Sequence, residues 1–112
     1  EQQQAELARK HEMIAMFKEV LETEDPNDLL ANFGLGKAYF DLGKYQESIP
    51  YFEKAIQANK HYSVAYLNLG KSLEYSEQKE KAKEIYQQGI VVASQKGDLM
   101  PLKEMEQRLN SL

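Results

Sequence analysis

The sequence contains no cysteine, and this absence removes several classes of site from consideration. A chain without thiols cannot form disulfides, hold zinc through thiolates or use a cysteine nucleophile. The same absence leaves the redox compartment undecided. The chain has 112 residues, which is enough for one domain whose core needs no covalent cross-link.

Long apolar runs and an excess of positive charge are also missing. No apolar stretch approaches the roughly 18 residues that a membrane-spanning helix needs, so we expect no membrane span. The formal net charge is -4, which argues against a nucleic-acid partner. The chain begins at Glu1 without a methionine or a signal segment, so we expect either a mature product or a piece of a longer chain.

Motifs for catalysis and for metal or nucleotide binding are incomplete. His11 and His61 do not have the spacing of a metal site. The acidic residues between Glu22 and Asp28 lack the glycine and the final glutamate of a calcium loop. The Gly-Leu-Gly-Lys segment at 34–37 falls inside an expected helix and not after a strand, unlike a phosphate-binding loop. We therefore expect no enzyme activity, no cofactor and no metal.

An internal repeat organises the middle of the chain. A displacement by 34 residues superimposes five identical pairs, which are Ala31 and Ala65, Leu35 and Leu69, Gly36 and Gly70, Lys37 and Lys71, and Ile56 and Ile90. Each copy has the apolar periodicity of a helix, a short turn and a second helix. No segment shows the alternation of period two that is typical of a strand.

The periodicity predicts an all-α chain of about six helices joined by short turns. Asn27 or Asp28 is the expected N-cap of the second helix, and Asp98 that of the last one. Gly43 is expected to end the second helix in a left-handed conformation. The expected helices are residues 4–23, 29–42, 45–59, 62–75, 79–94 and 99–111.

The two copies resemble the tetratricopeptide repeat. Its 34-residue pattern is Trp-x2-Leu-Gly-x2-Tyr, then Ala-x3-Phe-x2-Ala, then a closing Pro. The first copy matches this pattern at Leu35, Gly36, Tyr39, Phe52 and Ala55, and the second at Leu69, Gly70 and Ala82. Asn32 and Tyr66 stand in the place of the tryptophan, and Lys60 and Ser94 in the place of the closing proline.

The resemblance implies a right-handed α-solenoid of antiparallel helix pairs. Gly36 and Gly70 would then let the two helices of one unit approach closely, while Phe52 and Tyr86 fill the space between units. The expected parts are an N-terminal helix from an incomplete unit at 1–28, complete repeats at 29–62 and 63–96, and a capping helix at 97–112.

In this family, the first helix of each unit lines a concave face that binds peptides. The resemblance therefore implies a non-enzymatic protein-interaction module. Lysines on this face would pair with acidic groups of the partner, Asn68 would bond to its backbone, and the apolar residues would contact its side chains. Helical projection assigns to the peptide groove Phe33, Lys37, Phe40, Leu67, Asn68, Lys71 and Tyr75, with Leu30, Asp41 and Val64 beside them.

Two questions about these groove residues stay open at this point. Phe33 and Phe40 face away from the core stripe, so either the N-terminal helix covers them, or they contact a peptide, or they mediate self-association. Lys37 and Lys71 occupy equivalent positions in adjacent units. They either share one carboxylate or are two solvated lysines.

The expected partner is a protein or a peptide. Residues 1–28 carry a net charge of -5 and residues 29–96 a net charge of +2, so the groove either faces acidic peptides or docks the acidic N-terminal helix. We do not expect the clamp that some family members use for chaperone tails. Of its positions only Asn68 matches, and the others hold Phe33, Lys37, Asp98 and Leu102.

Two alternatives to peptide binding follow from the incomplete unit at 1–28. Its apolar face could accept a helix from a second copy, which would give a homodimer, including a domain-swapped one. The chain could also be a structural segment of a longer repeat protein.

Overall fold

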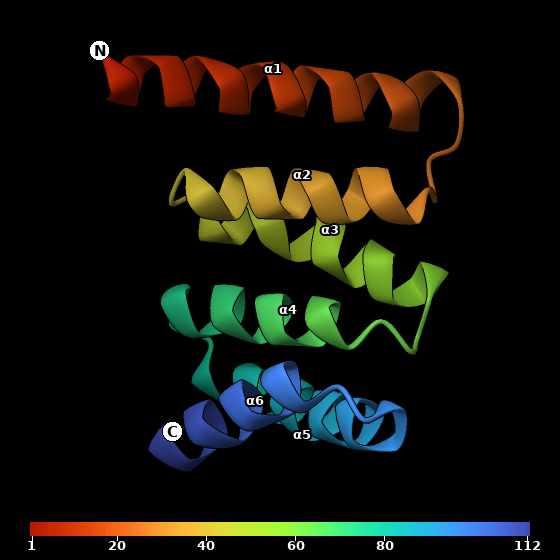
Figure 1. Ribbon diagram of the computed structural model, residues 1–112, viewed down its shortest axis with the longest axis vertical. Helices are drawn as coiled ribbons and strands as arrows, with labels where there is room; N and C mark the ends of the chain where they lie inside the picture. The colour runs from red at the N-terminus through yellow and green to blue at the C-terminus, as the bar shows by residue number, and fades with distance from the viewer.

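A computed structural model describes all residues of the chain, 1–112, and contains six α-helices and no strand (Figure 1). The expectation of an all-α fold is confirmed, and each helix begins and ends within about two residues of its expected position. The helices are α1 (Gln2–Thr23), α2 (Leu29–Asp41), α3 (Tyr45–Ala58), α4 (Ser63–Tyr75), α5 (Lys79–Lys96) and α6 (Leu99–Ser111).

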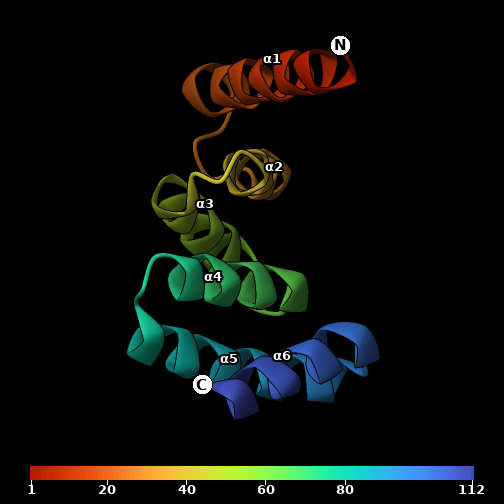
Figure 2. The ribbon, with the colours of Figure 1, turned by 90° about the vertical axis from the view of Figure 1, so that its left-hand side faces the viewer.

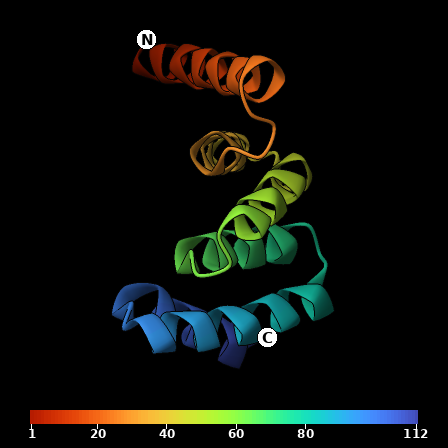
Figure 3. The same cartoon turned by 90° about the vertical axis from the view of Figure 1, so that its right-hand side faces the viewer.

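The molecule measures 37 × 32 × 23 Å, and its helices are stacked along the longest axis (Figures 2 and 3). Helix α1 lies at one end of the stack, and α5 and α6 lie at the other. Each helix packs on the next one in the chain, and α4 also packs on α2 and α6. Because the contacts join near neighbours in sequence, the stack is layered, as in a repeat protein.

Local chemistry explains where α2 begins and ends. The side chain of Asp28 accepts a hydrogen bond from the backbone N of Ala31 at 2.8 Å, so Asp28 is the N-cap. Gly43 follows the helix with a φ of 76°, the left-handed conformation expected there.

The start of α6 differs from the expectation. Asp98 occupies its N-cap position but makes no capping hydrogen bond. Its carboxylate instead accepts a hydrogen bond from the hydroxyl of Ser63, the first residue of α4, and lies 3.5 Å from the Nζ of Lys96. The Ser63 hydrogen bond, helped by the charge of Lys96, holds the pKa of Asp98 below its ordinary value. Asp98 therefore joins two helices instead of capping one.

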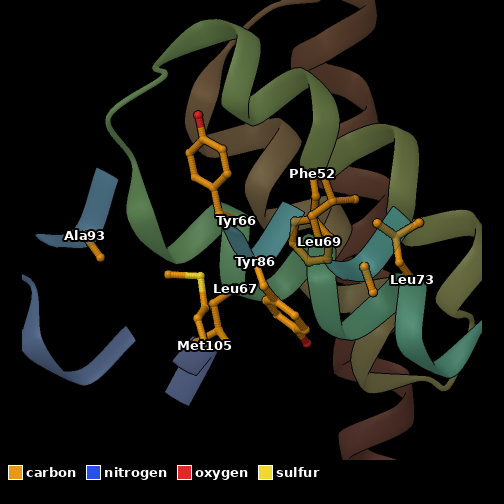
Figure 4. Close-up of a cluster of buried hydrophobic side chains, with 9 residues drawn as sticks. Phe52, Tyr66, Leu67, Leu69, Leu73, Tyr86, Ala93 and Met105 are labelled. Atoms are coloured by element: carbon orange, nitrogen blue, oxygen red, sulfur yellow. The ribbon is translucent and has the colours of Figure 1, made fainter. Parts of the chain in front are cut away.

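Two apolar clusters hold the stack together. The larger one joins α3, α4, α5 and α6 (Figure 4). The smaller one joins α1 to α2 through Ile14, Leu35 and Ala38. The larger cluster consists of Phe52, Tyr66, Leu67, Leu69, Leu73, Ala82, Tyr86, Ala93 and Met105.

Aromatic rings lie directly on three of the four helical glycines, among them Gly36 and Gly70, where close approach of the paired helices was expected. A Cβ added at Gly36 would meet the ring of Phe52 at 2.6 Å, and one at Gly70 would meet the ring of Tyr86. A Cβ added at Gly34 would meet the ring of Phe17 of α1 at 2.5 Å, a contact that was not expected from the sequence. The glycines therefore set how closely neighbouring helices approach.

Candidate functional site

Helices α2, α4 and α6 lie side by side and present one continuous surface, called here the α2–α4–α6 face. Two of these helices are the first helices of the repeated copies. The third, α6, was expected to act as a cap. This face carries most of the side chains that the sequence assigned to a peptide groove.

Three aromatic rings form a cluster on this face. Phe40 of α2 lies 5.1 Å from Tyr45 of α3 and 5.8 Å from Tyr75 of α4, measured between ring centroids. Tyr45 and Tyr75 are 4.9 Å apart. Tyr75 is 47% exposed to solvent. Phe40 and Tyr45 are half-buried, so the cluster offers a partner an ordered apolar contact area mainly through Tyr75.

The aromatic contacts also settle where Phe33 and Phe40 go. Phe33 packs on Phe52 at 5.6 Å and on Tyr62 at 5.1 Å. Neither phenylalanine is covered by α1, so that possibility is wrong. The reason is the helical period: the side of α2 that α1 packs against carries Leu35 and Ala38, and residues 33 and 40 project from the opposite side.

Three cationic side chains surround the aromatic cluster, one from each helix of the face. The Nζ atoms of Lys37 and Lys71 each lie 5.6 Å from the ring centroid of Phe40. The Cζ of Arg108 lies 5.9 Å from the ring centroid of Tyr75. These distances are in the range of cation–π attraction, which holds the cations beside the rings.

Carboxylates of the chain itself contact these cations. Lys37 lies 3.7 Å from Asp41, whose other carboxylate oxygen is 2.8 Å from Lys10 of α1. Lys71 lies 3.4 Å from Glu104 of α6. Within the chain each lysine therefore has its own carboxylate partner, and α6 supplies the partner of Lys71.

Arg108 is the most connected of the three cations. Its Nε donates a hydrogen bond to Glu104 at 3.1 Å, and its Nη1 donates one to Glu74 of α4 at 3.3 Å. Burial alone would lower the pKa of Arg108, but the hydrogen bonds with Tyr75 and Glu104 raise it above its ordinary value. Sequence reasoning missed this residue because α6 was treated as a cap, and no spacing signal relates α6 to α4.

Glu74 connects the face to the core. It accepts a hydrogen bond from the hydroxyl of Tyr86, whose ring is fully buried. Burial, followed by the charge and hydrogen bond of Glu74, raises the pKa of the Tyr86 hydroxyl. Tyr86 therefore stays protonated and donates to Glu74, which fixes the position of Arg108.

Leu67 and Asn68 have almost no surface on the α2–α4–α6 face. Leu67 is 8% exposed and belongs to the larger apolar cluster together with Met105 of α6 (Figure 4). Asn68 is 5% exposed, and its amide donates a hydrogen bond at 2.9 Å to the carbonyl of Val64 in the same helix. The packing of α6 on α4 takes Leu67 out of the groove that the sequence suggested.

An open hollow of about 630 Å³ lies beside the cations, between α4 and α6. Met100 at its edge is 84% exposed. The lining residues are Glu74 of α4 and Met100, Lys103, Glu104, Gln107, Arg108 and Ser111 of α6.

No group of acidic or histidine side chains in the structure is arranged to hold a metal ion. None of the six helices is long and apolar enough to cross a membrane.

Comparisons with known proteins agree with the repeated architecture. A family model described as tetratricopeptide repeat matches residues 31–93. A TPR repeat-containing protein of Pseudomonas aeruginosa is 30% identical over 100 residues, which cover 89% of this chain and 94% of that protein.

Solved structures show the same arrangement of helices. A solution structure of a Bordetella parapertussis protein has a TM-score of 0.73 at 26% identity, covering 91% of this chain and 84% of that one. A tetratricopeptide repeat domain protein of Salinibacter ruber has a TM-score of 0.68 at 24% identity, covering 75% of this chain and 93% of that one.

A third solved structure is the first TPR domain of Spaghetti, bound to an HSP90 peptide. It has a TM-score of 0.73 at 19% identity and covers 97% of this chain and 86% of that one, so the likeness concerns the fold alone. The family model spans more than half of the chain, and the Pseudomonas relative matches along most of its length. This chain belongs to the tetratricopeptide repeat family.

Proposed function

We propose that this chain is a non-enzymatic protein-interaction module that binds an acidic peptide or partner segment on the α2–α4–α6 face. Tetratricopeptide repeats are generally protein-interaction modules, and the Spaghetti domain was solved with a peptide bound. The observation that carries the proposal is a cation from each of three helices beside one exposed aromatic cluster. Such a surface fits a segment with both carboxylates and apolar side chains.

The residues proposed for binding differ from the seven that the sequence assigned to the peptide groove. Lys37, Phe40, Lys71 and Tyr75 stay in the set, and Arg108 joins it. Phe33 is half-buried against Phe52 and Tyr62 and contributes at the margin of the surface. Leu67 and Asn68 are left out because their side chains have almost no accessible area.

The existing ion pairs do not prevent binding. The side chain of Lys37 is 43% exposed and its contact with Asp41 is long, at 3.7 Å, while the side chain of Lys71 is 21% exposed and its partner Glu104 is 40% exposed. Ion pairs at such exposed positions contribute only about 0.2–1 kcal/mol, so a partner carboxylate can replace an internal one at little cost. The aromatic cluster adds contact area that does not depend on charge.

The test uses two fluorescein-labelled peptides that differ only in charge. The acidic probe alternates Glu and Leu between flanking serines, and the amide probe has Gln in place of each Glu. Fluorescence polarisation should show tighter binding of the acidic probe by the wild-type chain. The double variant Lys37→Glu/Lys71→Glu should weaken this binding by roughly tenfold or more, because two attractive charges become repulsive.

A charge-matched control separates the local effect from the change in net charge. Lys54→Glu/Lys81→Glu makes the same change at exposed positions of α3 and α5, outside the α2–α4–α6 face. This control should bind the acidic probe almost as the wild type does. Equal weakening by both double variants, or no binding of either probe to the wild type, would contradict the proposal.

Self-association and a place within a longer repeat protein stay predictions. The observation in favour of both is the outer surface of α1. This helix packs on α2 alone, and its side chains Leu7 and Met16 are 48% and 52% exposed. The aromatic cluster combines apolar surface with a cation from each of three helices, so peptide binding is the better-supported function.

A further inference from the structure

One carboxylate already occupies the space between two of the proposed binding cations. The same oxygen of Glu104, Oε2, lies 3.4 Å from the Nζ of Lys71 and 3.1 Å from the Nε of Arg108. Lys71 comes from α4, while Glu104 and Arg108 are one turn apart on α6. Glu104 therefore bridges the two helices at the centre of the face.

Each of the three proposed binding cations has a carboxylate of the chain beside it. Lys37 lies beside Asp41, Lys71 beside Glu104, and Arg108 beside Glu74 and Glu104. Burial alone would raise the pKa of Glu104, but the hydrogen bond from Arg108 and the charge of Lys71 outweigh it, so the pKa lies below its ordinary value. Glu104 is thus ionised at neutral pH, and an acidic ligand has to compete with it for Lys71 and Arg108.

Glu74 and Glu104 have different roles in this balance. Glu74 has 18% of its side chain exposed and accepts the hydroxyl of the buried Tyr86. Glu104 has 40% of its side chain exposed, and both carboxylates border the open hollow between α4 and α6. Glu74 is therefore held by the core, whereas Glu104 has room to turn away from the two cations.

We propose that Glu104 is a specificity-determining residue of the α2–α4–α6 face. It occupies the position that a ligand carboxylate takes between Lys71 and Arg108, and an acidic ligand binds there by displacing it. This inference rests on the proposed peptide-binding function. The consequence is that the face selects by charge at this position. An acidic segment replaces the carboxylate of Glu104 with its own, while an amide segment gains nothing there.

Because Glu104 competes with the ligand, removal of this acidic residue should strengthen the binding of an acidic ligand. Glu104→Gln keeps the size of the side chain and removes its charge. We expect the variant to bind the acidic probe about three- to tenfold more tightly, because the probe no longer competes with an internal ion pair. Binding of the amide probe should stay unchanged, since that probe does not use the released cations.

A second variant controls for the general effect of net charge. Glu106→Gln makes the same change on the same helix, at an exposed residue that lines a different hollow beside Ile90. It should leave the affinity for the acidic probe within about twofold of the wild type, because charges at a distance are screened by salt. Circular dichroism and thermal unfolding of both variants check that the helical stack is intact.

A double-mutant cycle tests whether the effect is local. In a Lys71→Gln background, one of the two cations that Glu104 neutralises is gone. Glu104→Gln should then give a smaller gain than it gives in the wild type. An equal gain in both backgrounds would overturn the inference, because it would mean that Glu104 acts through its charge at long range.

The outcomes separate this inference from the proposed function. Wild-type binding of the acidic probe with no difference between Glu104→Gln and Glu106→Gln overturns the role of Glu104 and leaves the peptide-binding function in place. Absence of acidic-probe binding in both the wild type and Glu104→Gln overturns the function itself. A gain confined to Glu104→Gln and to the acidic probe supports both.

Discussion

Single residues decide how closely the helices of this stack approach one another. Tyr86 of α5 has no exposed surface, and its ring lies against the backbone of α4 at Gly70. The equivalent contact in the preceding copy is made by Phe52 on Gly36. An aromatic ring has no short flexible end that could move aside, so a side chain at either glycine must push two helices apart.

Gly70→Val is the residue-scale prediction. The branched side chain would overlap the Tyr86 ring, and we expect the free energy of unfolding to fall by about 3 kcal/mol or more through overpacking. Chemical denaturation monitored by circular dichroism measures the change. The control Gln88→Val introduces the same residue at an exposed position of α5 and should cost less than about 1 kcal/mol. Unchanged stability of Gly70→Val would show that Gly70 does not lie at the α4–α5 contact.

At the scale of elements, the two turns between paired helices place different residue types in the left-handed conformation. Gly43 follows α2 with a φ of 76°, and Glu77 follows α4 with a φ of 61°. Both belong to the left-handed region, which glycine adopts without strain and which costs an L-residue with a Cβ roughly 1–2 kcal/mol. The second turn therefore carries backbone strain that the first turn does not.

Glu77→Gly is the element-scale prediction. We expect it to raise the free energy of unfolding by about 1 kcal/mol, since the relief of strain exceeds the entropy that glycine adds to the unfolded chain. The reverse change at the equivalent turn, Gly43→Glu, should lower stability by a similar amount. Midpoints of urea denaturation compare the two. A loss of stability on Glu77→Gly would mean that the glutamate side chain contributes more than its backbone strain costs.

At the scale of the whole molecule, stability is distributed unevenly along the stack. Helix α1 packs on α2 alone, and Ile14 is its only buried residue. Helix α4, in the middle, packs on four other helices and has nine buried residues. In a stack that depends on contacts between neighbours, an end helix with one neighbour opens at lower free energy than a helix inside it.

Hydrogen exchange tests this uneven distribution. Amides of α1 should exchange faster than those of α4, and Ile14→Ala should accelerate exchange in α1 while leaving α4 unchanged. The control Met16→Ala truncates an apolar side chain of α1 that is 52% exposed, and its effect should be small. If Ile14→Ala accelerated exchange in α4 equally, the stack would be one cooperative unit.

The repeat period, the six helices and the close contacts at Gly36 and Gly70 followed from the sequence. Helix formation depends on apolar spacing within a turn or two, and turns depend on residues such as Asp28 and Gly43. These are local properties of the chain, and they recur in each copy. The division into an incomplete unit, two complete repeats and a cap stays a prediction.

Only the tertiary structure decided what each groove residue contacts. Leu67 is buried beside Met105 of α6, and Lys71 forms an ion pair with Glu104 of the same helix. No spacing within α4 specifies these contacts, because they depend on how α6 lies against it. The sequence by itself determined the helices and their order. The stacking determined which long, flexible charged side chains meet, and hence the composition of the proposed binding face.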